Sequence, residues 1–131
     1  MISRSGIHAF KAMAVLGGLP PEEYLGAEAI AARIHAPGNY LGKLLRQLSR
    51  AGVVEGRKGG NGGFRLARPR ETITLLEVLE PIERVVRAEE CILGRPRCSA
   101  GKPCALHVGW SHVRTAYLEF LRTTKVSELG A

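Results

Sequence analysis

A glycine-rich segment between two strand-like runs sets the strongest limit on how this chain can fold. Residues 56–63 contain five glycines, and Arg57 and Lys58 are the only charged residues among them. Val53-Val54 before the segment and Phe64-Arg65-Leu66 after it have the composition of strands, so the pattern predicts a β-hairpin. So many glycines are entropically costly in a purely structural turn, but they let a basic backbone lie close to a phosphate chain or enter a groove. The alternative interpretation is an ordinary mobile loop.

Apolar residues at helical spacing predict three helices before this hairpin. Ser3 is a suitable N-cap for a first helix that ends at Gly17-Gly18. A short helix from Ala27 to Ile34 is closed by Ala36-Pro37-Gly38, and a third helix runs from about Asn39 to Arg50. Its inward face is predicted to carry Tyr40, Leu41, Leu44, Leu45 and Leu48. Two short helices joined by a tight Pro-Gly turn are typical of a helix-turn-helix.

The second half of the chain is predicted to be helical on both sides of a cysteine-containing loop. Thr72 or Thr74 caps a helix that runs from Leu75 to about Val86, with Leu76, Leu79 and Ile82 as its core residues despite Pro81. A long helix from about Ala105 to Thr123 has an apolar stripe wider than one thin domain can bury. We expect it to be exposed and to mediate dimerisation through Val113, Tyr117, Phe120 and Leu121. The fold class is therefore mainly α with a small β-hairpin.

Positive charge is concentrated in the first half of the chain. Residues 1–70 contain 11 Lys/Arg and 4 Glu, whereas residues 71–131 contain 8 of each, so the whole net charge of +7 belongs to the first half. Between Arg33 and Arg70 there are nine basic residues and one acid, Glu55. This asymmetry favours double-stranded DNA as partner, although solubility alone can also explain a basic chain. The residues predicted to contact DNA are Asn39, Tyr40, Lys43 and Arg46 in the third helix and Arg57, Lys58 and Asn61 in the hairpin.

The three cysteines of the chain fall within fourteen residues, at Cys91, Cys98 and Cys104, and His107 follows the last of them. Thiolates and an imidazole gathered in one loop can hold zinc or an iron–sulfur cluster. The gaps of six and five residues between the cysteines are longer than the spacing usual in zinc turns, which disfavours zinc. An odd number of cysteines without a leader peptide argues against a disulfide framework, and no apolar run is long enough for a membrane span. We expect a cytoplasmic protein with no membrane partner.

Over essentially its whole length the chain resembles the IscR/NsrR/RirA family of bacterial winged-helix regulators. The matching segments are Tyr40-Leu41, Ala51-Gly52-Val53-Val54, residues 59–69 of the glycine-rich hairpin, residues 73–79, and the cysteine triplet. The resemblance implies a winged helix-turn-helix DNA-binding domain over residues 1–80, followed by a cluster-binding loop and dimerisation helix over residues 81–131. It also implies a homodimer whose long C-terminal helices cross, and a palindromic DNA operator.

The resemblance further implies a cofactor, a [2Fe-2S] or [4Fe-4S] cluster. Cys91, Cys98 and Cys104 match the cluster cysteines of the family, and His107 matches the fourth ligand of the IscR branch. In the NsrR branch the remaining ligand is an acidic residue of the partner's first helix; that position is occupied here by His8, and the chain contains no Asp. A further departure concerns DNA reading, because Gly42 stands where the IscR branch has a glutamate.

Three functions follow from these observations. The first is a transcriptional regulator, such as a repressor, that senses iron, redox state or nitric oxide through an iron–sulfur cluster. The second is a winged-helix regulator that binds zinc or works as a cluster-free thiol switch. The third is a small iron–sulfur electron carrier, which would leave the basic hairpin unexplained. An enzyme is not expected, because the sequence has no Ser/His/Asp grouping and no phosphate-binding loop signature.

Overall fold

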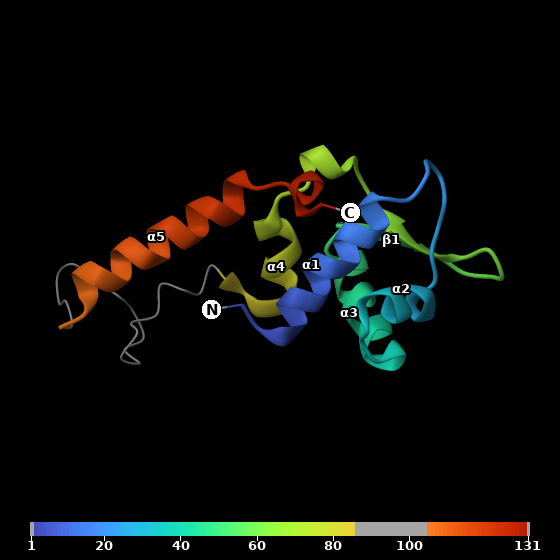
Figure 1. The fold of residues 1–131 in the computed structure, drawn as a ribbon, viewed down its shortest axis with the longest axis horizontal. Coiled ribbons are helices and arrows are strands. Elements are labelled where there is room, and N and C mark those ends of the chain that lie inside the picture. The colour runs from blue at the N-terminus through green and yellow to red at the C-terminus, as the bar shows by residue number, and fades with distance from the viewer. Residues whose placement is uncertain (1, 86–104, 131) are drawn as a thin grey trace.

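The helices and the hairpin follow the order that the sequence predicts. The computed structural model describes residues 2–85 and 105–130. Helices α1 to α4 and the hairpin form a head, and helix α5 extends from it on the side away from the hairpin (Figure 1). The elements are α1 Arg4–Gly17, α2 Ala27–Ile34, α3 Gly38–Arg50, β1 Val54–Arg57, β2 Gly63–Leu66, the 3-10 helix η1 Arg70–Thr72, α4 Leu75–Glu83, α5 His107–Thr123 and the 3-10 helix η3 Val126–Leu129. The predicted fold class, mainly α with a small β-hairpin, is confirmed.

The first three helices begin and end close to the predicted residues because their caps are encoded locally. Ser3 caps α1, with its Oγ accepting a hydrogen bond from the backbone N–H of Gly6 at 3.0 Å. Helix α2 ends where His35 adopts a left-handed conformation, with φ of 57°. Pro37 then stands at the N-cap of α3, so the break between the two helices is the tight turn expected of a helix-turn-helix.

One apolar core holds the head together. It is made of buried side chains from α1, α2, α3, β1, α4 and η3, together with Val53 and Ile73 from the adjoining segments. The larger members are Met13, Leu16, Ile30, Ile34, Leu41, Leu44, Leu45, Leu48, Val54, Ile73, Val78 and Val126. Val126 comes from η3, so the chain returns to the head after α5.

The strands of the hairpin are longer than the sequence suggests. They pair antiparallel from Val54 opposite Leu66 to Arg57 opposite Gly63. The tip therefore spans residues 58–62 rather than the whole run 56–63. We call residues 54–66 the wing. A third segment joins it, because the backbones of Leu25 and Phe64 exchange two hydrogen bonds of 2.9 and 2.8 Å.

Helix α4 agrees with its prediction at its N-terminus and differs from it at two other points. Its N-cap is Thr74, whose hydroxyl accepts from the backbone N–H of Glu77, whereas Thr72 lies in η1. The helix ends at Glu83 rather than near Val86, because Arg84 takes a left-handed conformation with φ of 52°. Leu79 is buried as predicted, but Leu76 and Ile82 are only partly buried, and the central buried residue that the prediction omits is Val78.

A second, smaller core joins α5 to α4. Its buried members are Leu75, Leu79, Val85 and Leu121. The expectation that Leu121 is exposed for dimerisation is wrong, since this side chain is fully buried inside its own protomer. The reason is that the last turn of α5 is tied back to α4, with the N–H of Leu75 donating to the carbonyl of Thr124 at 2.9 Å. Among the helices that the structure describes, none is long and apolar enough to cross a membrane.

Candidate nucleic-acid interface

Helix α3 separates an apolar face from a basic one. Leu41, Leu44, Leu45 and Leu48 recur at helical spacing and are buried in the head core. The opposite face is exposed to solvent and carries Asn39, Lys43 and Arg46, with Gln47 and Arg50 beside them. The predicted DNA-contact residues of this helix thus lie together on one accessible surface, apart from Tyr40.

Tyr40 is neither a buried core residue nor a fully exposed one. Its hydroxyl donates to the Oγ of Ser5 at 2.9 Å and lies 3.2 Å from Nδ1 of His8. The rings of Tyr40 and His8 meet edge to face, with centroids 5.5 Å apart. Tyr40 therefore ties the first turn of α3 to α1, so its hydroxyl is already engaged within the head.

The wing presents Arg57, Lys58 and Asn61, all exposed to solvent. Nη2 of Arg57 donates to the carbonyl oxygen of Asn61 at 2.9 Å, which closes the base of the tip. Cζ of Arg57 also lies 4.5 Å from the centroid of the Tyr24 ring. The sequence interpretation missed Tyr24; the only available signal was an aromatic residue next to a turn, which says nothing about the hairpin it contacts.

Two glycines of the wing are required by close contacts. Gly63 has φ of 134°, and a Cβ there would lie 2.4 Å from the carbonyl carbon and oxygen of Leu25. A Cβ on Gly62 would lie 2.1 Å from the carbonyl oxygen of Arg57. Both positions therefore need glycine so that the wing can pack against the Leu25 segment and close on itself.

The nine cations between Arg33 and Arg70 divide into two groups. Arg65 is ion-paired with Glu55, Arg68 with Glu77, and Arg70 with Glu71. Within the described part of the chain the other six have no ion pair with an acid; they are Arg33, Lys43, Arg46, Arg50, Arg57 and Lys58. The positive charge left unneutralised thus lies on α2, on α3, at the end of β1 and at the wing tip, and all four predicted DNA-contacting cations belong to it.

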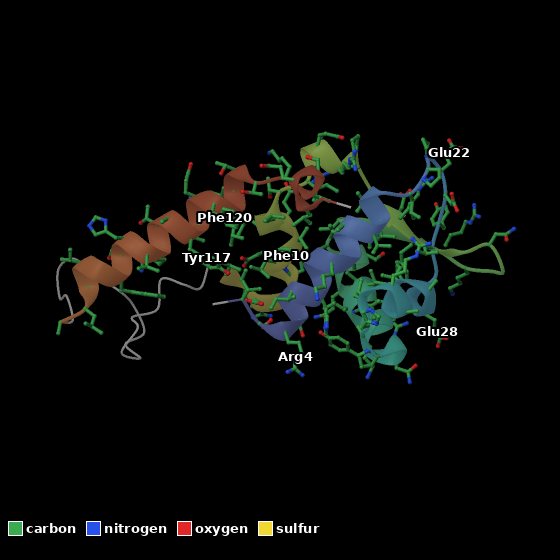
Figure 2. All side chains as sticks on the ribbon, in the orientation of Figure 1. Arg4, Phe10, Glu22, Glu28, Tyr117 and Phe120 are labelled. Atoms are coloured by element: carbon green, nitrogen blue, oxygen red, sulfur yellow. The ribbon has the colours of Figure 1, made fainter. Side chains whose placement is uncertain are left out.

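The pairing of Arg65 is reflected in its ionisation. The hydrogen bond to the carboxylate of Glu55 raises the pKa of the Arg65 guanidinium, and smaller coulombic effects of Tyr24 and Glu22 act in the same direction. Figure 2 shows Glu22 on the loop between α1 and α2. The charge of Arg65 is thus already matched by acids of the same protomer.

The predicted metal ligands are only partly within the described residues. Cys91, Cys98 and Cys104 lie outside them. His107 is the first residue of α5 and is half-buried, whereas His8 lies on α1 against Tyr40. The start of α5 is at the end of the helix farthest from the head (Figure 1), so one protomer does not bring the two histidines together. In residues 2–85 and 105–130 no group of three His, Cys, Asp or Glu side chains could hold a metal.

The predicted dimerisation residues have different environments. Val113 and Phe120 are 46% and 52% exposed, whereas Leu121 belongs to the second core. Tyr117 is half-buried on the side of α5 that faces α4, as Figure 2 shows. Burial raises the pKa of the Tyr117 phenol, with a smaller contribution from the charge of Glu83. An apolar strip centred on Val113 and Phe120 therefore remains exposed on α5.

Comparison with known proteins gives one consistent result. The profile of a family described as "Rrf2: Iron-dependent Transcriptional regulator" matches residues 2–131. A protein of Aquifex aeolicus (strain VF5) assigned as an HTH-type transcriptional regulator is 32% identical over 124 residues, which cover 93% of this chain and 85% of that protein. The HTH-type transcriptional regulator IscR of Vibrio vulnificus is 31% identical over 91 residues, covering 70% of this chain and 54% of its own length.

Solved structures share the fold. CymR (YrzC), the global cysteine regulator of B. subtilis, superimposes with a TM-score of 0.82 at 23% identity, over 98% of this chain and 95% of that one. T. potens IscR superimposes with a TM-score of 0.78 at 22% identity, over 98% of this chain and 85% of that one. At these identities the likeness establishes the fold alone.

Proposed function

The chain belongs to the Rrf2 family of transcriptional regulators, and from this premise we propose that it binds a palindromic operator as a homodimer and senses its signal through an iron–sulfur cluster. Its family and relatives are transcriptional regulators and not enzymes. The observation that carries the DNA-binding proposal is the group of six cations on α2, α3 and the wing that have no acidic partner among residues 2–85 and 105–130.

In the proposed complex α3 enters the major groove and the wing lies along the minor groove. Asn39, Lys43 and Arg46 face base edges or phosphates from α3, and Tyr40 contributes its ring edge beside them. Arg57, Lys58 and Asn61 face the minor groove. Cations that are not neutralised within the protein are those that can release counterions from DNA.

The division of the cations gives a direct test. A duplex is first selected from a random pool with the wild-type protein, and its affinity is measured over a range of salt concentrations. Lys43→Ala and Arg46→Ala are each expected to lower the salt slope by about one per lost phosphate contact. Arg68→Ala and Arg70→Ala, which remove paired charges, serve as matched controls and should leave it nearly unchanged. Equal salt slopes for the two α3 variants and the two control variants would refute the proposed interface.

We place the sensor in the loop of Cys91, Cys98 and Cys104, with His107 at the start of α5 as the fourth ligand. Three thiolates and one imidazole suit an iron–sulfur cluster, which would supply reversible redox or ligand chemistry when bound. His8 of the partner protomer is the alternative fourth ligand. Zinc or a cluster-free thiol switch is the second candidate, since solved structures with this fold include both an IscR and a cysteine regulator.

Anaerobic purification decides between these candidates. Visible absorption together with iron and sulfide counts is expected for a cluster, whereas a colourless protein with tightly bound zinc supports the second candidate. Cys98→Ala and Cys104→Ala should bleach the absorption while the helical circular dichroism remains. His107→Ala should weaken cluster retention more than His8→Ala; the opposite order would favour the ligand from the partner protomer.

We propose that residues 1–80 form the DNA-binding domain and that residues 81–131 carry the cluster loop and the dimerisation helix. The support for dimerisation is the exposed strip of Val113 and Phe120 on α5, which two antiparallel copies can bury reciprocally. Phe120→Asp should give monomers in analytical ultracentrifugation and loss of binding to a two-half-site duplex. Thr115→Asp adds the same charge at another exposed position of α5 and should remain dimeric.

A further inference from the structure

We propose that Tyr24, which belongs neither to α3 nor to the wing, positions the guanidinium of Arg57 and thereby sets how strongly the wing reads the minor groove. The inference rests on the proposed DNA-binding function and adds a residue to it. Tyr24 would be a positioning residue, because it acts on DNA through Arg57.

The Tyr24 ring contacts two arginines of the wing. Cζ of Arg57 lies 4.5 Å and Cζ of Arg65 lies 4.7 Å from its centroid. Both distances are within the range of a cation–π interaction. In the antiparallel register Arg57 stands opposite Gly63 and Arg65 opposite Glu55, so the two side chains emerge on the same face of the hairpin. One tyrosine ring thus packs against the basic face of the wing.

The backbone around Tyr24 is fixed to the wing independently of these side chains. The adjacent residue Leu25 exchanges two backbone hydrogen bonds with Phe64. A side chain at Gly63 would collide with this segment, so the close approach depends on a specific glycine. The ring is therefore held at a fixed place relative to the strand that carries Arg57.

The two arginines differ in what the ring can do for them. Arg65 is bonded to Glu55, which orients it and neutralises its charge. Arg57 has no ion pair with an acid in the part of the chain that the structure describes. Its orientation comes from the Tyr24 ring and from one hydrogen bond to the carbonyl of Asn61. A guanidinium has five N–H donors, so four remain for DNA after this bond is made.

The surroundings of the ring also limit the direction from which DNA can approach. Tyr24 and Arg57 line a hollow of about 420 Å³ together with Glu22, Glu23 and Asn61. Two carboxylates on this side disfavour a phosphate there, so the available donors of Arg57 serve DNA at the wing tip. An arginine held in place loses less conformational entropy on binding than a free one. Tyr24 therefore favours a single bound geometry of Arg57.

The test is a double-mutant cycle on the duplex selected with the wild-type protein. Tyr24→Leu removes the ring face and Tyr24→Phe retains it. Each is measured alone, and Tyr24→Leu is also combined with Arg57→Ala and, as a matched control, with Lys43→Ala on α3. Thermal melts of every variant report whether the head remains folded.

We expect Tyr24→Leu to bind about two- to fivefold more weakly per wing, from the strength of an exposed cation–π contact. Tyr24→Phe should bind like the wild type. The loss should disappear in the Arg57→Ala background and persist in full with Lys43→Ala. A purely structural role for Tyr24 would give the same loss in both backgrounds.

A second measurement addresses the minor groove directly. Replacing adenine by 2,6-diaminopurine in the selected duplex adds the minor-groove amino group that otherwise marks G·C pairs. Wild type should lose affinity for this duplex, and Tyr24→Leu and Arg57→Ala should lose less. Equal losses in all three proteins, tighter binding by Tyr24→Leu, or additivity with Arg57→Ala would overturn the inference. If the wild type selects no duplex at all, the proposed DNA-binding function itself fails.

Discussion

Replacement of Gly63 by alanine tests the packing of the wing most directly. The new Cβ would lie 2.4 Å from the carbonyl group of Leu25, and φ at this residue is 134°. A residue forced into so unfavourable a conformation costs about 1–3 kcal/mol. Relief of the collision requires the Leu25 segment to separate from the wing, which loses two hydrogen bonds with Phe64, each worth about 0.5–1.5 kcal/mol. We therefore expect Gly63→Ala to lower the free energy of unfolding by about 2–6 kcal/mol.

The matched control is Gly60→Ala, three residues away in the tip of the wing. No heavy atom lies within 4 Å of a Cβ at Gly60, and its φ is outside the left-handed range. This variant should be neutral or more stable by up to about 1 kcal/mol, since alanine restricts the unfolded chain. Urea and thermal melts followed at 222 nm measure the stability of both variants. The Tm of Gly63→Ala is expected to fall by at least about 8 °C.

Local detachment of the wing is distinguished from global unfolding by amide hydrogen exchange. If only the Leu25 segment separates, the N–H groups of Leu25 and Phe64 exchange faster in Gly63→Ala while those of the head core remain protected. Either a lower Tm or this local loss of protection is consistent with the argument. The argument would be refuted if Gly63→Ala had the same stability and the same amide exchange rates as Gly60→Ala.

Three further predictions concern the second core and helix α3. Leu121→Ala should lower the free energy of unfolding in urea melts by about 2–5 kcal/mol, because Leu121 is fully buried. The control Val108→Ala, at a 70% exposed position, should lower it by less than about 1 kcal/mol. Burial raises the pKa of the Tyr117 phenol above the ordinary 10.0. The folded state therefore favours the protonated phenol, and the resulting stabilisation is fully present below pH 10.0 and is lost as the pH rises through the folded-state pKa. Melts at increasing alkaline pH should show this loss of stability in the wild type and not in Tyr117→Phe. A Cβ on Gly42 would make ordinary contacts, 3.8 Å from Nη1 of Arg46 and 3.9 Å from Cβ of Ala27. The carboxylate of Gly42→Glu is expected to pair with Arg46, one helical turn away, and to lower the salt slope of DNA binding by about one; an unchanged slope would count against a phosphate contact by Arg46.

Local signals explain why the head could be predicted from the sequence. Caps such as Ser3 and Thr74, the break at Pro37 and the leucine spacing of α3 act within one or two helical turns. Each of these signals determines a helix end or a buried face without reference to the rest of the chain. The boundaries of α1, α2 and α3 accordingly agree with the structure within one residue.

Contacts between distant segments explain what the sequence did not show. The burial of Leu121 depends on α5 returning to α4. The proposed role of Tyr24 depends on the pairing of its neighbour Leu25 with Phe64, 39 residues further along the chain. Tyr40 was expected among the inward residues because of its helical spacing, but its hydroxyl needs polar partners and finds Ser5 on α1. Periodicity identifies a face of a helix; it does not say what covers that face.

The second core also suggests how a signal at the proposed cysteine sensor would reach helix α3. In the sequence, residues 86–104 with the three cysteines stand between Val85 and α5. Val85 and Leu121, a residue of α5, are both buried in the core that includes Leu79 of α4. At the end of α4, the carboxylate of Glu83 accepts from the backbone N–H and the hydroxyl of Ser3, the N-cap of α1.

From Ser3 the contacts continue along the first turns of α1 to α3. Gly6 lies so close to α4 that a Cβ would be 2.4 Å from Glu83 and 2.7 Å from Leu79. Ser5 and His8, on the first two turns of α1, contact the hydroxyl of Tyr40. A displacement of α4 would therefore act directly on α1, and a displacement of α1 would act on the first turn of α3, where Asn39 faces solvent. Because α1 contacts both α4 and the first turn of α3, it is the element through which a change near α4 would be passed to α3 in the proposed regulator.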